Sequence, residues 1–233
     1  MIRPFLSCSL AFSVLLAVSV PAEQTGPPRR VLAADDSTRR LAIVAPDGSL
    51  EWEMKVGAIH DAWVLPNGNI LFQQGWTKIV EVTPDKQTVW EYDAAKMNGN
   101  EGKRVEVHAF QRLDDGLTMI VESGPARIIE VDKAGRIQRE VKLKVNNPST
   151  HSDTRLVRKI ASGHYLVAHE SDGFVREYGA TGKIVWDYEV PLLGKERKGG
   201  HGPEAFATRC SAPSASRTAI RSSAQATATA SSK

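Results

Sequence analysis

The strongest constraint on this chain is internal repetition. Residues 59–94 return twice further along in altered form, and the three copies begin near His60, His108 and Arg155. A sequence that repeats with a period of about 40 to 50 residues builds its fold from one supersecondary unit stacked against copies of itself. The repeat therefore has to be interpreted before any single motif.

Each copy contains four short apolar runs that alternate with turn-forming dipeptides. The runs are rich in Val, Ile, Leu, Tyr and Trp, and the dipeptides include Asn67-Gly68, Asp115-Gly116 and Thr181-Gly182. This pattern predicts four antiparallel strands joined by tight hairpins. Four-stranded units of this length form a β-propeller when they are arranged around an axis, because each blade buries its faces against its neighbours. A β-sandwich with accidental internal similarity is the alternative.

The repeat array opens in the middle of a unit. Residues 31–35, 40–44 and 49–53 match the second, third and fourth strands of the repeat, and no first strand precedes them. Propellers that open in this way usually take the missing strand from the other end of the chain, which hides the free edges. We predict an all-β chain in which residues 31–206 form an incomplete β-propeller of about three and a half four-stranded antiparallel blades.

The N-terminal residues have the pattern of a secretory leader. Arg3 supplies a positive charge, residues 5–20 are apolar, and small residues surround Ala22. We predict a signal peptide at 1–22 and a linker at 23–30, so that the mature chain is secreted or periplasmic and has no membrane span after the signal is removed. The apolar run is short for a membrane helix, and an uncleaved anchor is the alternative.

Residues 207–233 differ from the rest of the chain. They are rich in Ala, Ser, Thr and Arg, and no aromatic residue follows Phe206. Back-translation and a shift of one base allow a product with the Leu-x-x-Gly-Asn turn of the repeat and an Arg-Val-Ile-Glu run similar to residues 127–130. We interpret this segment as a frameshifted continuation, so that the protein is truncated. A disordered low-complexity tail is the alternative.

Charge and cysteine content exclude two classes of protein. The formal charge is +3 with both signs interleaved, and no Lys/Arg cluster alternates with aromatic residues, so nucleic acid is not an expected partner. Of the two cysteines, Cys8 lies in the leader and Cys210 in the tail, and no disulfide framework is expected. Stability must therefore come from the packing of the blades.

Three polar residues occupy the same place in successive copies. His60 and His108 lie eight residues before their hairpin glycines, Gly68 and Gly116, and Arg155 keeps this offset in the third copy. Because the first strand of each blade lines the central channel, these side chains should converge on the axis. Two imidazoles and a guanidinium suit a small anion, and His is also a candidate nucleophile, acid or base. The alternative is that these side chains cap strands or bind loop backbones.

The chain also carries side chains of the kinds that bind metals. His151, Asp153 and His201 carry suitable ligand groups, but no short fixed spacing links them, so no metal is predicted.

The repeat resembles two known groups of propellers. The runs 47–52 (Asp-Gly-Ser-Leu-Glu-Trp) and 180–186 (Ala-Thr-Gly-Lys-Ile-Val-Trp) are similar to the tryptophan-docking repeat of the pyrroloquinoline-quinone (PQQ)-like propellers. That resemblance implies that Trp52, Trp90 and Trp186 pack against a neighbouring blade. The quinone-binding members carry adjacent cysteines, which this chain lacks, so no cofactor is predicted and a quinone-dependent dehydrogenase is the least favoured function.

The second resemblance concerns chemistry. His60-Asp61 followed by residues 65–71 (Leu-Pro-Asn-Gly-Asn-Ile-Leu) looks like the repeat of arylsulfotransferase-type propellers, whose channel His and Arg residues transfer a sulfuryl group. This implies candidacy for His60 and His108 as catalytic residues. Two functions stay open: an exported propeller that binds a small anionic ligand or a protein partner, and an exported enzyme with its active site at His60, His108 and Arg155. Fold alone does not choose between them.

Overall fold

The computed structural model describes residues 27–196 and 198, and this part of the chain is almost entirely β-structure. The first sheet contains β1 (Val31–Asp35), β2 (Arg40–Val44) and β3 (Leu50–Lys55). The second contains β4 (Ala62–Val64), β5 (Ile70–Gln74), β6 (Lys78–Val82) and β7 (Thr88–Asp93), and a short 3-10 helix, η1 (Ala94–Lys96), follows it.

The third and fourth sheets repeat this arrangement. The third contains β8 (Phe110–Arg112), β9 (Thr118–Glu122), β10 (Arg127–Val131) and β11 (Ile137–Lys142). The fourth contains β12 (Leu156–Lys159), β13 (Tyr165–His169), β14 (Phe174–Tyr178) and β15 (Ile184–Glu189). Within each sheet every strand pairs antiparallel with its neighbour in sequence.

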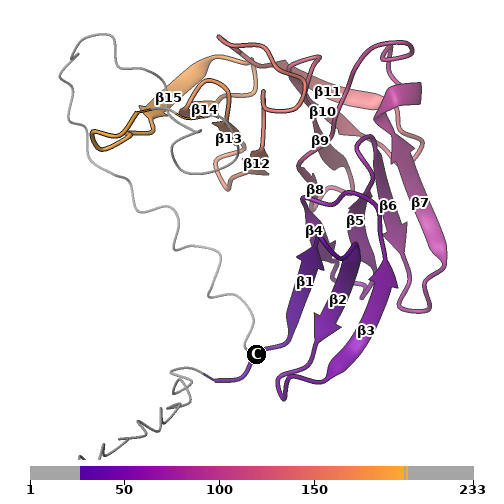
Figure 1. The fold of residues 1–233 in the computed structure, drawn as a ribbon. Coiled ribbons are helices and arrows are strands. Elements are labelled where there is room, and N and C mark those ends of the chain that lie inside the picture. Colours follow the sequence, from indigo (N-terminus) through magenta and orange to yellow (C-terminus); the bar gives the residue numbers. More distant parts are fainter. Residues whose placement is uncertain (1–26, 197, 199–233) are drawn as a thin grey trace, which may run out of the picture.

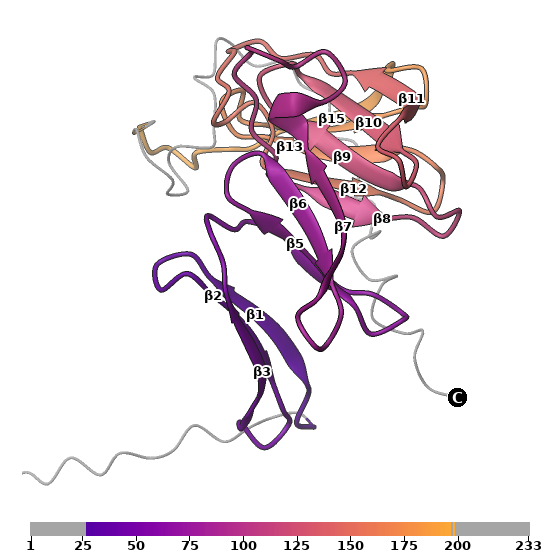
Figure 2. The same cartoon turned by 90° about the vertical axis from the view of Figure 1, so that its right-hand side faces the viewer.

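The predicted fold class is confirmed. Figures 1 and 2 show the four sheets following one another as blades around a common axis, which is the arrangement of a propeller and not that of two facing layers. We call these sheets the first to fourth blades. The first blade has three strands, as the sequence pattern predicted, and the others have four.

The register shows how closely the blades repeat. In all four blades the pairing of the last two strands shifts by one residue, at Ile43/Val44, Glu81/Val82, Glu130/Val131 and Glu177/Tyr178. Such an irregularity bends and twists the outer strand.

The predicted signal peptide and the frameshifted tail lie outside the described residues, and those two interpretations stay predictions.

The core lies between successive blades. One apolar cluster joins the first and second blades, a second joins the second and third, and a third joins the third and fourth. Fully buried side chains such as Leu41, Tyr92 and Tyr178 belong to these clusters.

Within residues 27–196 and 198, no helix has the length and apolar character that a membrane crossing requires.

Two of the three predicted docking tryptophans reach the next blade. The Trp52 indole N–H donates to the Pro84 carbonyl at 2.8 Å, and the Trp90 indole N–H donates to the Lys133 carbonyl at 3.0 Å. Each acceptor belongs to the turn before the last strand of the neighbouring blade. Trp186 lies on β15 of the fourth blade, where 39% of its surface is exposed and its ring stacks on Tyr188.

Candidate functional site

The structure places His60, His108 and Arg155 at the same register position. Each lies just before the inner strand of its blade, eight residues ahead of a glycine with positive φ in the first hairpin turn: Gly68, Gly116 and Gly163. The following residues also pair alike with the second strand: Asp61 with Gln73, Ala109 with Val121, and Leu156 with Ala168. The offset in sequence therefore corresponds to equivalent positions in space.

The three side chains converge although they come from different blades. Arg155 Nη1 lies 3.4 Å from Nε2 of His60 and 3.3 Å from Nδ1 of His108. The rings of His60 and His108 meet edge to face, with their centroids 4.8 Å apart. These imidazoles contact each other and the guanidinium, which is not the arrangement expected of residues that cap strands or bind loop backbones.

Three further residues complete the group, and the sequence did not assign them to it. Arg155 Nη2 lies 3.1 Å from Nε2 of His151, and Arg155 Nε donates to Oε2 of Glu170. Glu106 Oε2 lies 2.7 Å from Nδ1 of His151 and 3.2 Å from Nε2 of His108. We call this group the axial cluster; it consists of His60, Glu106, His108, His151, Arg155 and Glu170.

An exposed indole borders the axial cluster. Trp76 follows β5, and 42% of its surface is exposed. Its ring centroid lies 5.3 Å from that of His60 and 5.3 Å from that of His151. A flat aromatic surface beside a guanidinium can stack on a planar ligand while the cation reaches a polar substituent.

The imidazoles of His60 and His108 favour the neutral form. Burial, and then the positive charge of Arg155, lowers the pKa of His60. Burial lowers the pKa of His108 to about 3, and Arg155 adds to the effect. Both rings can therefore accept a proton or a hydrogen bond at neutral pH.

The network fixes the tautomers of two of these rings. A guanidinium N–H only donates, so Nδ1 of His108 and Nε2 of His151 accept from Arg155. The protons then reside on Nε2 of His108 and Nδ1 of His151, and both face Glu106. His108 Nε2 is buried, and its contact with Glu106 lacks hydrogen-bond geometry.

A second polar link crosses the axis next to the axial cluster. Arg158 from β12 donates Nη1 and Nη2 to the two carboxylate oxygens of Asp61 at 2.9 and 3.0 Å. The same guanidinium lies over the ring of Trp63, 4.7 Å from its centroid. Burial raises the pKa of Asp61, although Arg158 opposes this shift. This pair connects the fourth blade directly to the second.

Of the potential metal ligands noted in the sequence, the structure describes His151 and Asp153. The Asp153 carboxylate accepts hydrogen bonds from the backbone N–H groups of Ser149 and Gly124. His201 lies outside the described residues. His151 instead joins Glu106 and His108, and the ligand atoms of these three residues all lie within 4.8 Å of one another. The Glu-x-His spacing of Glu106 and His108 was the available sequence signal, because it places both side chains on one face of an extended segment.

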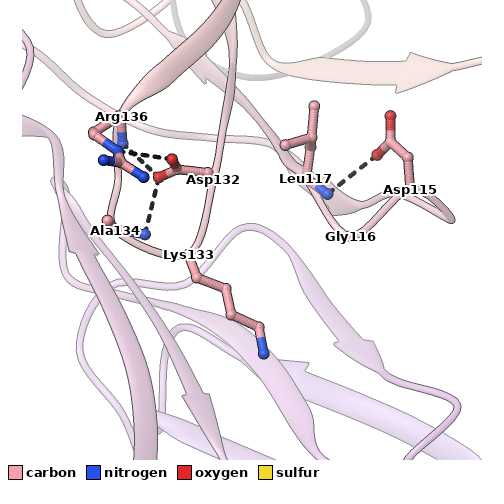
Figure 3. Close-up of a pocket in the computed structure, with 7 residues that line it drawn as sticks. All are labelled: Asp115, Gly116, Leu117, Asp132, Lys133, Ala134 and Arg136. Atoms are coloured by element: carbon pink, nitrogen blue, oxygen red, sulfur yellow. Dashed lines mark hydrogen bonds and ion pairs between the residues drawn. The ribbon is translucent and has the colours of Figure 1, made fainter.

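A surface hollow at the other end of the third blade is not part of this site. It lies between the turn after β8 and the turn before β11 (Figure 3), whereas His108 lies before the start of β8. Figure 3 shows that its carboxylates serve the turns themselves: Asp115 accepts from Leu117 N–H, and Asp132 accepts from Ala134 N–H and from Arg136.

Comparison with known proteins supports the fold alone. No protein-family model matches the chain, and neither does any curated protein sequence. A protein of unknown function from Bacteroides caccae is 21% identical with a TM-score of 0.59, over 70% of this chain and 58% of that one. Virginiamycin B lyase from Staphylococcus aureus is 15% identical with a TM-score of 0.51, over 72% of this chain and 54% of that one.

A third similar structure is a β-propeller domain. The WD40 β-propeller domain of Doa1 is 15% identical with a TM-score of 0.51, over 70% of this chain and 51% of that one. The chain thus spans between half and three fifths of the length of these structures. The similarity to β-propeller proteins agrees with the blades described above, and it carries no activity over to this chain.

Proposed function

We propose that this chain is an exported propeller that binds a small ligand at the axial cluster, and that the ligand combines a planar ring with an acidic group. The supporting observation is the position of Arg155, whose Nη atoms contact imidazoles from three separate segments beside the exposed Trp76. The acidic group would exchange contacts with the guanidinium, and the ring would stack on the indole.

The exposed part of the cluster suits a ligand approaching from solvent. His60 is exposed, and 40% of the His151 side chain is exposed, whereas His108 is buried beneath them. A ligand would therefore reach Trp76, His60 and His151 first. Arg155 lies deeper, because only 15% of its side chain is exposed. Removal of an acidic group from water beside a partly buried guanidinium strengthens their attraction.

Calorimetric titration with 4-nitrophenyl sulfate tests this proposal. Arg155→Gln is expected to weaken binding at least tenfold, because a charge-assisted pair contributes about 1.5 to 3 kcal/mol. Arg136→Gln is the matched control, since Arg136 is an exposed arginine at the opposite end of the third blade. Trp76→Ala should weaken binding of the aryl sulfate but not of inorganic sulfate. Equal affinity of the wild type and Arg155→Gln would refute the proposal.

A second candidate function is sulfuryl transfer. Partial burial and the charge of Arg155 lower the pKa of His60, which favours the neutral ring that can act as a nucleophile. In such a reaction the sulfur–oxygen bond of the aryl ester breaks, a bond forms from sulfur to an imidazole nitrogen, and the phenolate leaves. An acceptor phenol then takes the sulfuryl group and frees the imidazole. Release of 4-nitrophenol, and its loss in His60→Ala, would favour this enzyme over a binding module.

A further inference from the structure

The inner side of the axial cluster presents three ligand groups of the kinds that bind transition metals. Glu106 Oε2, His108 Nε2 and His151 Nδ1 face one another, at 3.2 Å for the Glu106–His108 pair and 2.7 Å for the Glu106–His151 pair. Ligand atoms around a tetrahedral zinc ion lie about 3.4 Å apart, given metal–ligand bonds of about 2.0 to 2.2 Å. Both separations are shorter than this value, by about 0.2 and 0.7 Å, so the Glu106 carboxylate would have to move away from the two imidazoles to admit an ion.

A buried nitrogen supplies an independent sign of a missing partner. The His108 side chain has no exposed surface, and its Nε2 makes no hydrogen bond within the part of the chain that the structure describes. A buried polar atom without a hydrogen bond costs about 1 to 3 kcal/mol, and such atoms are uncommon in folded proteins. Nε2 lies 3.2 Å from Oε2 of Glu106, and a cation held between these two groups would give the nitrogen a partner.

The local charge also favours a cation. Arg155 contributes one positive charge, whereas Glu106 and Glu170 contribute two negative charges. The carboxylates therefore exceed the guanidinium by one charge in a partly buried setting. A divalent ion beside Glu106 would reverse this imbalance.

We propose that Glu106, His108 and His151 form a binding site for a divalent transition-metal ion of the zinc type. Two imidazoles and one carboxylate, with a fourth position left open, suit zinc and similar ions and do not suit calcium or magnesium. This site does not depend on the proposed ligand-binding function, because all three ligands belong to this chain and metal binding is measured without any organic ligand.

Metal binding at this site would break the hydrogen bonds that Arg155 donates to His108 and His151. Coordination through His108 Nε2 and His151 Nδ1 moves the ring protons to His108 Nδ1 and His151 Nε2, which are the nitrogens that now accept from Arg155. Two N–H groups cannot donate to each other, so the metal and the Arg155 contacts exclude one another. The guanidinium then keeps Glu170 as its partner. Arg155 is thus expected to oppose metal binding.

Titration of the chelator-treated full chain with Zn²⁺, followed by calorimetry, tests the site. The wild type should bind one ion per chain. His151→Gln and Glu106→Gln should each weaken binding at least tenfold, whereas Arg155→Gln should strengthen it. His151→Gln is the main variant because His151 is partly exposed and its loss should not unfold the chain. Visible absorption of bound Co²⁺ in the tetrahedral range is the second readout.

A matched control is available on the surface. His164 Nδ1 lies 2.7 Å from Glu177 Oε1, a His–Glu pair for which no third ligand lies nearby in the described chain. His164→Gln should leave Zn²⁺ affinity unchanged. If His151→Gln and Glu106→Gln bind Zn²⁺ as the wild type does, or if Arg155→Gln loses binding, the site is refuted. Failure of 4-nitrophenyl sulfate to bind would leave these results unaffected, so the two proposals fail separately.

Discussion

The junction between the second and third blades and the junction between the third and fourth blades are packed with different residues. Between the second and third blades, Trp90 packs across the junction, and Arg112 lies over its ring while pairing with Glu81 at 2.8 Å. Arg139 takes the place of Trp90 in the next copy and pairs with Glu130 at 2.7 Å. Glu81 and Glu130 occupy equivalent positions, and the cation equivalent to Arg112 at the next junction is Lys159, which pairs with Glu130.

Side chains of the neighbouring fourth blade take the place of the missing indole. Tyr165 of the fourth blade donates its hydroxyl to Glu130 Oε1 at 2.7 Å, and Lys159 reaches the same oxygen and lies over the tyrosine ring. Burial would raise the pKa of Glu130, but hydrogen bonds from Lys159, Tyr165 and Arg139 outweigh burial and lower it. A junction that lacks the indole thus depends more strongly on one buried carboxylate.

The largest expected effect is the difference in stability lost when Glu130 or Glu81 is replaced. Glu130→Gln should lower the free energy of unfolding by about 3 kcal/mol, because it leaves partly buried cations without their counter-charge. Glu81→Gln should cost roughly half as much, since Glu81 is less completely buried and has fewer partners. Urea denaturation of both variants measures the difference. Equal losses would show that the junctions are equivalent despite their different residues.

The next effect is acid sensitivity at the junction of the third and fourth blades. His169 donates Nδ1–H to the Asp153 carbonyl and accepts from the Tyr178 hydroxyl at Nε2, and burial lowers its pKa to about 4. The unfolded chain binds this proton near pH 6.5, so the stability contribution is complete above that pH and is lost as the pH falls toward 4. The loss is on the order of 3 kcal/mol at most.

Denaturation midpoints measured between pH 7 and 4.5 test this expectation. His169→Gln should fall less steeply with decreasing pH than the wild type, although part of the slope should remain because the pKa of His108 is also lowered. A slope unchanged in His169→Gln would mean that His169 is not buried as the neutral ring.

The smallest expected effect concerns the indoles. Trp90→Phe should cost about 1 kcal/mol, because it removes the hydrogen bond to Lys133 and reduces contact with Arg112. Trp186→Phe should change stability by less than about 0.5 kcal/mol, since Trp186 lies on an exposed face of the fourth blade. Thermal unfolding of the two variants compares them directly. If Trp186→Phe lost more stability than Trp90→Phe, the contacts of Trp90 across the blade junction would not be the source of the stabilisation.

Much of this fold could be predicted from local pattern. Turn dipeptides and apolar runs placed the strands, and the offset of eight residues placed His60, His108 and Arg155 together, because a fixed distance from a hairpin glycine fixes the register. The sequence predicted no metal site. Asp153, one of the ligand groups that it offered, accepts hydrogen bonds from backbone N–H groups instead.

The sequence by itself determined the repeat, the strand order and the equivalence of three axial residues, since these follow from hydrogen-bond register along single hairpins. Only the tertiary structure decided that Glu106 and His151 meet His108 and Arg155. His151 stands outside the repeated offset, and its position depends on the path of the segment between β11 and β12. Contacts across blades depend on how loops fold back toward the axis, and no local periodicity encodes that path.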